Sequence, residues 1–508
     1  MHRSADGKWF LFILLVTSLL YLGSSGFFDL IITSYGSDVG HYLILAQSLG
    51  SGHGYSFVND PAHPATSRSP LLFSVLLSPV AAAIPHSMLA ARLFSVLIAL
   101  AAVVAGFVFA RHAMPKWSLA ITALFAWSVF TVSTAALPQS ELTFCLCLFL
   151  CLPMCDVYAR RASVRDPALV ALAVLMLAAM YTRLVGVVLA PALALALWLR
   201  EERRKALALT VAAILGFSPW LAYTYWINGV FLEPGYAIDF FQTARPSLGG
   251  SDLGVVAQTA LSNVAWYAAQ GIPDAVTGIF MGHVQATAAG LHVSWLLYAI
   301  GVVVSAVVAF GFGLRARRRL GAAEIFVVLY LGVVLLHWAQ LVRYLLPLAP
   351  LLYVYFLEAA EWLGRRLRMP WAGRLVVVAI LLIMLVRVAA FYEKGVSSIQ
   401  ARSGRQDWVS WLATETEDDA FIYSAASRIV SFRTNRYSLD YPGWLCASGS
   451  DIARLRRSGA TYVALHPVYE EFSQNYQCMA RAIKQNGSQF EQLFRDDRLR
   501  VIIYRMTE

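Results

Sequence analysis

A short polar segment after the first apolar run contains side chains that could do acid–base chemistry. It reads Ser37-Asp38-Val39-Gly40-His41-Tyr42, and a glycine-rich stretch with His53 follows it. Asp38 opens a predicted helix, and a helix N-terminus favours a charged carboxylate. An ionised carboxylate at the mouth of a cavity can accept a proton from an attacking hydroxyl. Asp38 is therefore a candidate general base, and capping of the helix that begins near Val39 is the alternative interpretation.

Three isolated arginines are candidates for binding an anion. Arg68, Arg183 and Arg343 each lie beside an apolar run, apart from the dense basic clusters of the chain. A guanidinium group stays charged and can donate two parallel hydrogen bonds to a phosphate. The alternative is that these side chains reach from helix ends to the membrane interface.

Glu141 is a second candidate acid, because it begins an apolar run directly after the turn Pro138-Gln139-Ser140. Carboxylates near membrane depth are costly and usually functional, whereas a structural role would be to complement the helix dipole. His41 and His53 could pair with Asp38, bind sugar hydroxyls or ligate a metal, although histidines in such loops more often form only surface hydrogen bonds. The first loop contains no Asp-x-Asp pair.

The elements that position these residues are apolar runs typical of a polytopic α-helical membrane protein. Of the 508 residues, 59% are hydrophobic and 14% are charged, whereas soluble domains carry about 25% charged residues. The mean hydropathy is +0.61. A shorter run, Pro70–Ile84, is predicted to be a re-entrant or interfacial helix. About eleven runs approach the length that a bilayer requires, beginning near Trp9, Met88, Trp117, Ser140, Pro167, Leu184, Ala206, Val293, Ala322, Tyr344 and Ala372.

The basic residues predict the orientation. With the N-terminus in the cytoplasm, every dense cluster lies inside, for example Arg315/Arg317/Arg318/Arg319. The prediction is a transmembrane domain of residues 1–392, with a first periplasmic loop at 33–87 and a large one at 228–292, and a periplasmic domain of residues 393–508. The net charge of +10 does not indicate nucleic acid, because it arises from these loop clusters and no nucleic-acid-binding motif accompanies it.

The tail has a mixed, charged composition that is typical of a small α/β domain. Cys446 and Cys478 lie in it, and an extracytoplasmic compartment would allow a disulfide between them. The other four cysteines lie within one apolar run, without the spacing of a zinc site. The predicted helices and strands are helices over Asp407–Thr416 and Ile452–Gly459, and strands over Ala420–Tyr423, Thr461–Leu465 and Val501–Tyr504.

The motifs on the outside of the predicted topology resemble, in their order, those of the GT-C glycosyltransferases that use polyprenyl-phosphate sugars. Protein O-mannosyltransferases and lipid A aminoarabinose transferases are such enzymes. Two departures are Val39, where many relatives have a second acid, and Ser69, which separates Arg68 from the Pro-Leu motif. The matching motifs are Asp38, Tyr42, Ala46–Leu49, Gly50–Gly54, Pro70-Leu71, Ala91-Arg92-Leu93, Pro138-Gln139-Ser140-Glu141, Thr182-Arg183 and Arg343-Tyr344-Leu345-Leu346-Pro347.

This resemblance implies a GT-C-like membrane domain and a transferase that acts outside the cytoplasm. Asp38 would activate the acceptor hydroxyl, Glu141 would act in the sugar or acceptor cavity, and Arg68, Arg183 and Arg343 would hold the donor phosphate. The expected substrate contacts are His41, Tyr42, His53 and Tyr344. The expected partners are a polyprenyl-phosphate sugar, a lipid, glycan or protein acceptor, and the lipid bilayer of the cell inner membrane. A divalent metal is not expected, although oligosaccharyltransferases of the same fold need one.

Two other function classes remain open from the residues alone. A secondary transporter would place polar residues near the bilayer midplane and often contain two repeats, and no repeat is evident. A non-catalytic scaffold with a periplasmic binding domain would not need acids and arginines on one side of the membrane. The sequence identifies neither the sugar nor the acceptor.

Overall fold

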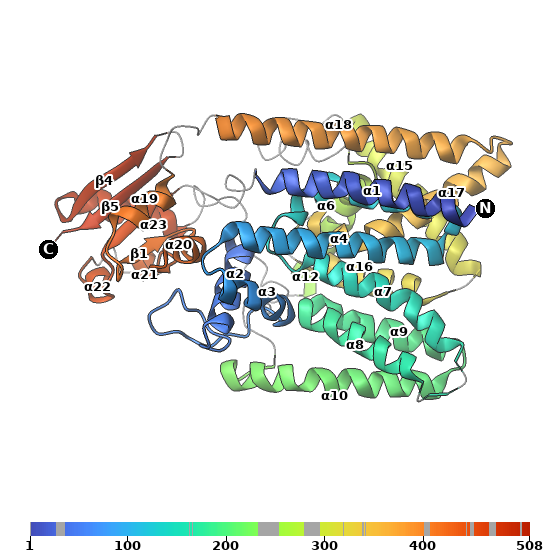
Figure 1. Ribbon diagram of the computed structural model, residues 1–508, viewed down its shortest axis with the longest axis horizontal. Coiled ribbons are helices and arrows are strands. Elements are labelled where there is room, and N and C mark those ends of the chain that lie inside the picture. Colours follow the sequence, from blue (N-terminus) through green and yellow to red (C-terminus); the bar gives the residue numbers. More distant parts are fainter. Residues whose placement is uncertain are drawn as a thin grey trace. The chain divides into compact units, whose positions relative to one another are not determined.

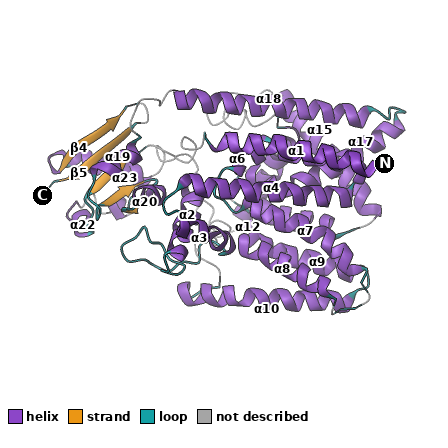
Figure 2. Ribbon diagram, viewed as in Figure 1, coloured by secondary structure: helices purple, strands orange, loops and turns teal. Residues whose placement is uncertain are grey.

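In the computed structural model of this protein, helices predominate, and within the described part of the chain the named strands are confined to the tail (Figure 2). Two compact units make up the fold. Unit 1 is formed by Met1–Ser24, Val96–Ala136 and Ser140–Glu393, and unit 2 by Ser25–Ser95, Leu137–Gln139 and Lys394–Glu508. The structure describes residues 2–26, 36–161, 163–164, 166–231, 253–278, 295–318, 320–337, 340, 342–400, 407–442, 444–447, 452–466, 474–497 and 500–507.

Long apolar helices make up most of unit 1 (Figure 1). They are helical because lipid cannot hydrogen-bond to a backbone, so each segment must satisfy its own N–H and C=O groups. The α-helices are α1 (His2–Ser25), α4 (Met88–Ala113), α5 (Ser118–Ala126), α6 (Val129–Ala135), α7 (Glu141–Ala159), α8 (Pro167–Thr182), α9 (Leu189–Trp198), α10 (Arg203–Asn228), α12 (Leu253–Trp266), α13 (Ile272–Thr277), α15 (Trp295–Arg318), α16 (Ala322–Leu336), α17 (Ala349–Arg366) and α18 (Ala372–Gln400). Shorter turns are the 3-10 helices η1 (Pro115–Trp117), η2 (Leu184–Val188) and η5 (Val342–Leu348) and the π-helix η4 (Tyr267–Gly271).

An apolar helix occupies each of the predicted runs. By length and composition, 7 helices could cross a membrane, and the bent pair Pro115–Ala126 and Val129–Ala135 would make 8. The remaining three predicted spans, Pro167–Thr182, Leu184–Trp198 and Ala322–Leu336, are helices of fewer than 18 residues. The polytopic helical fold predicted from the sequence is therefore confirmed, and the crossing of the three short helices stays a prediction.

The first loop folds into two short helices of unit 2, α2 (Gly36–Gly50) and α3 (Leu72–Ala83). They pack on each other, and α2 also packs on α20 (Ser427–Thr434) of the tail. Gly40 permits this approach, because a Cβ there would lie 2.7 Å from the Cβ of Arg428. The first loop and the tail therefore form one unit.

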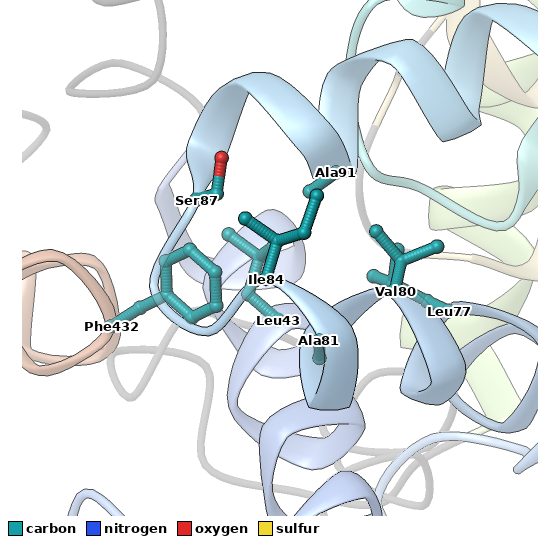
Figure 3. Close-up of a pocket in the computed structure, with 8 residues that line it drawn as sticks. All are labelled: Leu43, Leu77, Val80, Ala81, Ile84, Ser87, Ala91 and Phe432. Carbon is teal, nitrogen blue, oxygen red and sulfur yellow. The ribbon is translucent and has the colours of Figure 1, made fainter.

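A small apolar cavity marks the same packing interface. Figure 3 shows Phe432 of α20 beside Leu43 of α2 and Ile84, which follows α3. The volume of about 10 Å³ is at most enough for one water, and few polar groups face it. This cavity is consequently a feature of packing rather than a ligand site.

The tail contains a five-stranded sheet with the order β2-β1-β3-β5-β4. The strand β1 pairs in parallel with β2 and β3, and β5 pairs antiparallel with β3 and β4. The strands are β1 (Phe421–Ser424), β2 (Tyr437–Leu439), β3 (Tyr462–Leu465), β4 (Phe490–Asp496) and β5 (Val501–Met506). The predicted small α/β domain is present, and the prediction lacked the two edge strands β2 and β4.

Helices cover both faces of this sheet. Alternate residues of β1 divide between two cores, with Phe421 and Tyr423 in one and Ile422 in the other. The first core includes residues of α21 (Trp444–Ala447), α22 (Ile452–Arg457) and α23 (Gln474–Gln485), and the second includes residues of α19 (Trp408–Glu415) and α20. Cys446 and Cys478 form a disulfide that joins α21 to α23.

The large predicted loop at 228–292 is described only in part. Its described portion contains α12, η4 and α13. Asp274 of α13 is buried. Glu233, Tyr236, Asp239 and Asp252, which are further polar residues of this loop, lie outside the described residues.

Candidate functional site

Glu141 is a buried acid of unit 1. It is the first residue of α7, and its exposed fraction is 2%. The N-terminal turn of a helix carries partial positive charge, which favours a carboxylate there. Burial of a charge is costly unless cationic partners compensate for it, so the neighbours of Glu141 decide what this position can do.

Arg183 is one of these partners, and the end of α8 positions it. α8 begins with Asp166 as its cap and Pro167 in its first turn, and Arg183 follows its last residue with an extended backbone. The chain then turns back and approaches α8 closely at Gly186, where a Cβ would lie only 2.5 Å from the carbonyl oxygen of Ala179. This turn places the NH1 atom of Arg183 at 2.8 Å from Oε1 of Glu141.

Arg343 is the second cation beside the same carboxylate. Its NH1 atom lies 3.9 Å from Oε1 of Glu141, and η5 carries it from a distant part of the chain. Arg183 also donates a hydrogen bond to Oγ of Ser140, at 3.2 Å. The side chains of Arg183 and Arg343 are 19% and 28% exposed. Two partly accessible guanidinium groups therefore converge on one buried carboxylate.

Aromatic side chains hold the segment that carries Arg343. The guanidinium carbon of Arg343 lies 5.6 Å from the centre of the Tyr344 ring, a distance at which cation–π attraction operates. Tyr330 of α16 donates a hydrogen bond to the carbonyl of Tyr344, at 2.8 Å. The ring of His337 packs on that of Tyr344, with centroids 4.9 Å apart. The predicted residues Glu141, Arg183, Arg343 and Tyr344 are thus brought together in unit 1.

An apolar cavity of about 620 Å³ lies between α8, α9 and α10. These three helices are neighbours in Figure 1. The cavity lining includes Met180 and Val187, which flank Arg183 along the chain, and Ile214 and Phe217 of α10. A cavity of this size and apolar character suits a hydrocarbon chain.

Unit 2 contains a second charged cluster, around Asp38. Asp38 lies in the first turn of α2, and its charge, with that of Arg68, acts on the guanidinium of Arg428. Phe57 contacts two groups of this cluster, since its ring is 5.4 Å from the guanidinium carbon of Arg428 and 5.6 Å from the ring of His41. The sequence-predicted residues Asp38, His41 and Arg68 are therefore close to a cation of the tail.

Arg428 is the residue of this cluster that sequence reasoning missed. It belongs to α20, and its NH1 atom lies 3.1 Å from a carboxylate oxygen of Asp440. Burial lowers the pKa of Arg428, and Arg68 lowers it further, whereas Asp440 and Asp38 raise it. No local motif announced Arg428, because only the packing of α20 on α2 brings it to the first loop.

The other predicted site residues of the first loop make different contacts. Tyr42 is buried, and its ring packs edge-on against that of Phe73. His53 is exposed and lines a separate polar cavity whose lining does not include Asp38, His41 or Arg68. Among the described residues, no group of three or more His, Cys, Asp or Glu is arranged to hold a metal ion.

No protein-family model matches the sequence, and no curated protein matches it. Solved structures do match. The first is ArnT from Cupriavidus metallidurans, bound to undecaprenyl phosphate, with a TM-score of 0.57 and 14% identity over 98% of this chain and 98% of that chain. The chain has the GT-C fold.

Two further GT-C structures support this fold. The archaeal oligosaccharyltransferase AglB from Archaeoglobus fulgidus, in complex with an inhibitory peptide and a dolichol-phosphate, matches with a TM-score of 0.54 and 10% identity, over 96% of this chain and 73% of that chain. The apo form of the Archaeoglobus fulgidus oligosaccharyltransferase gives a TM-score of 0.51 and 11% identity, over 95% and 73%. Together with its apolar helices, the GT-C fold makes the chain a multi-pass membrane protein.

Proposed function

We propose that the protein is an integral-membrane glycosyltransferase that moves a sugar from a polyprenyl-phosphate donor to an acceptor hydroxyl on the extracytoplasmic side. The observation that carries this proposal is the convergence of Arg183 and Arg343 on the buried carboxylate of Glu141. The fold supports it, because the matched ArnT structure holds undecaprenyl phosphate and the matched AglB structure holds dolichol-phosphate. The sugar that is transferred in this proposal is a hexose or a pentose.

In this proposal Arg183 and Arg343 hold the donor phosphate, with Arg68 as a third cation. The cluster of Glu141, Arg183 and Arg343 carries two positive charges and one negative charge, so an anionic phosphate is attracted to it. The low dielectric of a partly buried site strengthens that attraction. Glu141 orients both guanidinium groups before the donor arrives and then faces the sugar or the acceptor. Arginines preset in this way need little reorganisation as negative charge develops on the leaving phosphate.

The prenyl chain would occupy the apolar cavity between α8, α9 and α10. The cavity is lined by residues that precede and follow Arg183, so a lipid lying in it could bring its phosphate to that arginine. Aliphatic side chains supply most of the lining, and a hydrocarbon chain requires no hydrogen-bonding partner there.

Asp38 is the general base of the proposed reaction. Its carboxylate accepts the proton of the acceptor hydroxyl while that oxygen attacks the anomeric carbon of the donor sugar. The new bond between carbon and acceptor oxygen forms as the bond to the phosphate oxygen breaks, and polyprenyl phosphate leaves as an anion. Arg428 attracts Asp38 electrostatically and so restrains the carboxylate on α2. The proposal retains His41, Tyr42, His53 and Tyr344 as substrate contacts.

The sidedness of the proposal has two supports. The basic clusters favour a cytoplasmic N-terminus and an extracytoplasmic tail in the inner membrane. The disulfide between Cys446 and Cys478 points in the same direction, because disulfides form and persist outside the reducing cytosol. The first loop belongs to the same unit as the tail, so the proposal puts Asp38 on the same side as the tail.

The test is transfer of a labelled sugar from polyprenyl phosphate to candidate lipid, glycan and protein acceptors in membranes that contain the protein. We expect Asp38→Asn to reduce transfer by about 100-fold or more, since general bases contribute roughly 10²–10⁴-fold. Asp60→Asn is the matched control, because Asp60 lies in the same loop and caps a turn through the N–H of Ala62. Normal transfer by Asp38→Asn, in protein that folds as the wild type does, would remove Asp38 as the base.

A further inference from the structure

A polar cavity of about 570 Å³ lies within unit 2, between the first loop and the tail. It is distinct from the cluster around Asp38, since none of the charged groups of that cluster lines it. The end of α2, the loop after it, the end of α3 and the segment around α20 all contribute to its wall. Among the lining residues are the three histidines His53, His63 and His86, together with Gln47, Asp418 and Arg436.

The hydrogen bonds of two histidines indicate which ring nitrogen carries the proton, and that of His86 determines it. Nδ1 of His86 lies 2.8 Å from the carbonyl oxygen of Phe432, so it must be the donor. Oγ of Ser51 lies 2.8 Å from both the carbonyl oxygen of Gln47 and Nδ1 of His53, so Nδ1 of His53 donates when that hydroxyl donates to the carbonyl. In these neutral tautomers the lone pair belongs to Nε2, which acts as an acceptor, and Nε2 of His86 lies 3.4 Å from the amide nitrogen of Gln47.

Two of these histidines are held in a backbone conformation that L-residues rarely adopt. The φ angle of His63 is 44° and that of His86 is 60°. Left-handed residues other than glycine are strained and cluster at functional sites. Asn435, which also lines the cavity, has a φ of 56°, but it ends α20, where asparagine is a common cap. The strain is therefore informative at His63 and His86.

The charges in the wall favour a neutral ligand. NH2 of Arg436 lies 2.9 Å from a carboxylate oxygen of Asp418 and also donates to the carbonyl of Thr416, at 3.1 Å. Its NH1 donates to the carbonyl of Thr434, at 3.2 Å. The cation of the wall is thus neutralised within the protein, and the acceptor nitrogens of His53 and His86 would repel an anion.

We propose that this cavity binds a neutral saccharide, as the glycan portion of the acceptor. Sugar hydroxyls can donate to the two Nε2 atoms and accept from the amide and hydroxyl groups of the wall. Val58, Pro85 and the Tyr437 ring offer apolar surface for the C–H faces of a sugar ring. The volume lies within the roughly 300–1,000 Å³ that is typical of small-ligand sites. The role as an acceptor site rests on the proposed transferase function, whereas saccharide binding itself does not.

The experiment is ligand-observed saturation-transfer NMR on the full-length protein in nanodiscs, which avoids detergents with sugar head groups. The probes are methyl glycosides of neutral hexoses and pentoses, neutral disaccharides, and inorganic phosphate. We expect saturation transfer to the neutral sugars at millimolar concentration and none to phosphate at pH 7. Absence of a signal up to about 10 mM, which corresponds to roughly 3 kcal/mol of binding free energy, or a preference for phosphate would overturn the proposal.

Two variants locate the binding. Ala82→Phe fills the cavity from the exposed end of α3, and Ala83→Phe is the matched control, because Ala83 is also exposed but does not line the cavity. We expect at least a tenfold loss of affinity in Ala82→Phe and wild-type affinity in Ala83→Phe. If Ala82→Phe fails to fold, His53→Ala decides instead, since His53 is exposed and its loss should also weaken binding. Equal affinity in the wild type and the folded variants would contradict the proposal.

Donor transfer is measured in the same preparations to separate the two proposals. Saccharide binding without any sugar transfer would refute the transferase function and leave the cavity as a saccharide site. Transfer without saccharide binding would refute only the cavity proposal.

Discussion

The substitution Glu141→Gln removes the one negative charge from the cluster that is proposed to bind phosphate. At an effective dielectric of about 20, unit charges attract by about 6 kcal/mol at the 2.8 Å of the Arg183 contact and by about 4 kcal/mol at the 3.9 Å of the Arg343 contact. Burial of the charged carboxylate costs desolvation free energy in the wild type, and the substitution removes this cost, which offsets much of the lost attraction. Loss of one partner from a buried pair typically costs about 3–5 kcal/mol. Because both arginines are partly exposed, we expect a loss of about 2–3 kcal/mol in the free energy of unfolding.

The same substitution should increase the stabilisation that a lipid phosphate provides. In the wild type the phosphate must share the two guanidinium groups with Glu141 and is repelled by it. In Glu141→Gln the phosphate replaces the missing negative charge. Since a ligand that binds only the folded state raises its stability, undecaprenyl phosphate should raise the Tm of this variant by more than it raises the Tm of the wild type.

Glu324→Gln is the matched control for this experiment. Glu324 is also buried, and it contacts Arg315, with 2.9 Å between Oε1 and Nε. The Glu324→Gln variant should be destabilised to a similar degree. Undecaprenyl phosphate, however, should raise the Tm of this variant no more than it raises the Tm of the wild type. The assay is thermal unfolding in nanodiscs with and without the lipid. Equal ligand-induced shifts in Glu141→Gln and Glu324→Gln would refute the assignment of the phosphate to Arg183 and Arg343.

Three further outcomes follow from the structure of unit 2. Arg428→Gln should lower kcat of sugar transfer by about tenfold or more with little change in donor KM, because it loosens Asp38 without touching the phosphate, and steady-state kinetics measure this split. Substitution of both Cys446 and Cys478 by serine should lower the free energy of unfolding by about 2–4 kcal/mol. Thermal unfolding of this variant is compared with that of the wild type before and after reduction of the disulfide. Glu417→Gln should cost at most about 1 kcal/mol at pH 7, since the pair is half exposed. A hydrogen bond from Tyr462 lowers the pKa of Glu417 from its ordinary value. The contribution is therefore present at pH 7 and should be lost as the pH falls through the lowered pKa, as unfolding measured at a series of decreasing pH values would show.

Much of the membrane part could be predicted from the sequence, because its rules are local. A run of apolar residues must be helical in lipid, and a proline or glycine at its end often marks where the helix stops. Asp166 caps α8 and Pro167 lies in its first turn, so these two residues indicate where the helix begins. Arg183 comes directly after the last residue of the same helix. The sequence led us to expect Asp38, Glu141, Arg183 and Arg343 around one outward cavity. The structure brings Glu141, Arg183 and Arg343 together in unit 1, whereas Asp38 belongs to unit 2, so its place in that cavity stays a prediction.

The parts that escaped sequence reasoning depend on contacts between distant segments. Arg428 lies in a short polar helix with no motif of its own, and its place beside the first loop follows from the close approach of α20 to α2 at Gly40. Strand β2 has three residues, and β4 is largely exposed, so neither carries a clear apolar alternation. His53 and His63 of the first loop line the polar cavity together with residues of the tail. The spacing of these residues along the sequence does not indicate that the two segments pack together.

The most direct test of the central claim is a cryo-EM structure of the protein with a polyprenyl phosphate bound. We predict phosphate density within hydrogen-bonding distance of the guanidinium groups of Arg183 and Arg343, with the prenyl chain in the cavity between α8, α9 and α10. Phosphate density bound elsewhere, with Arg183 and Arg343 still paired to Glu141 and far from the lipid, would contradict the account.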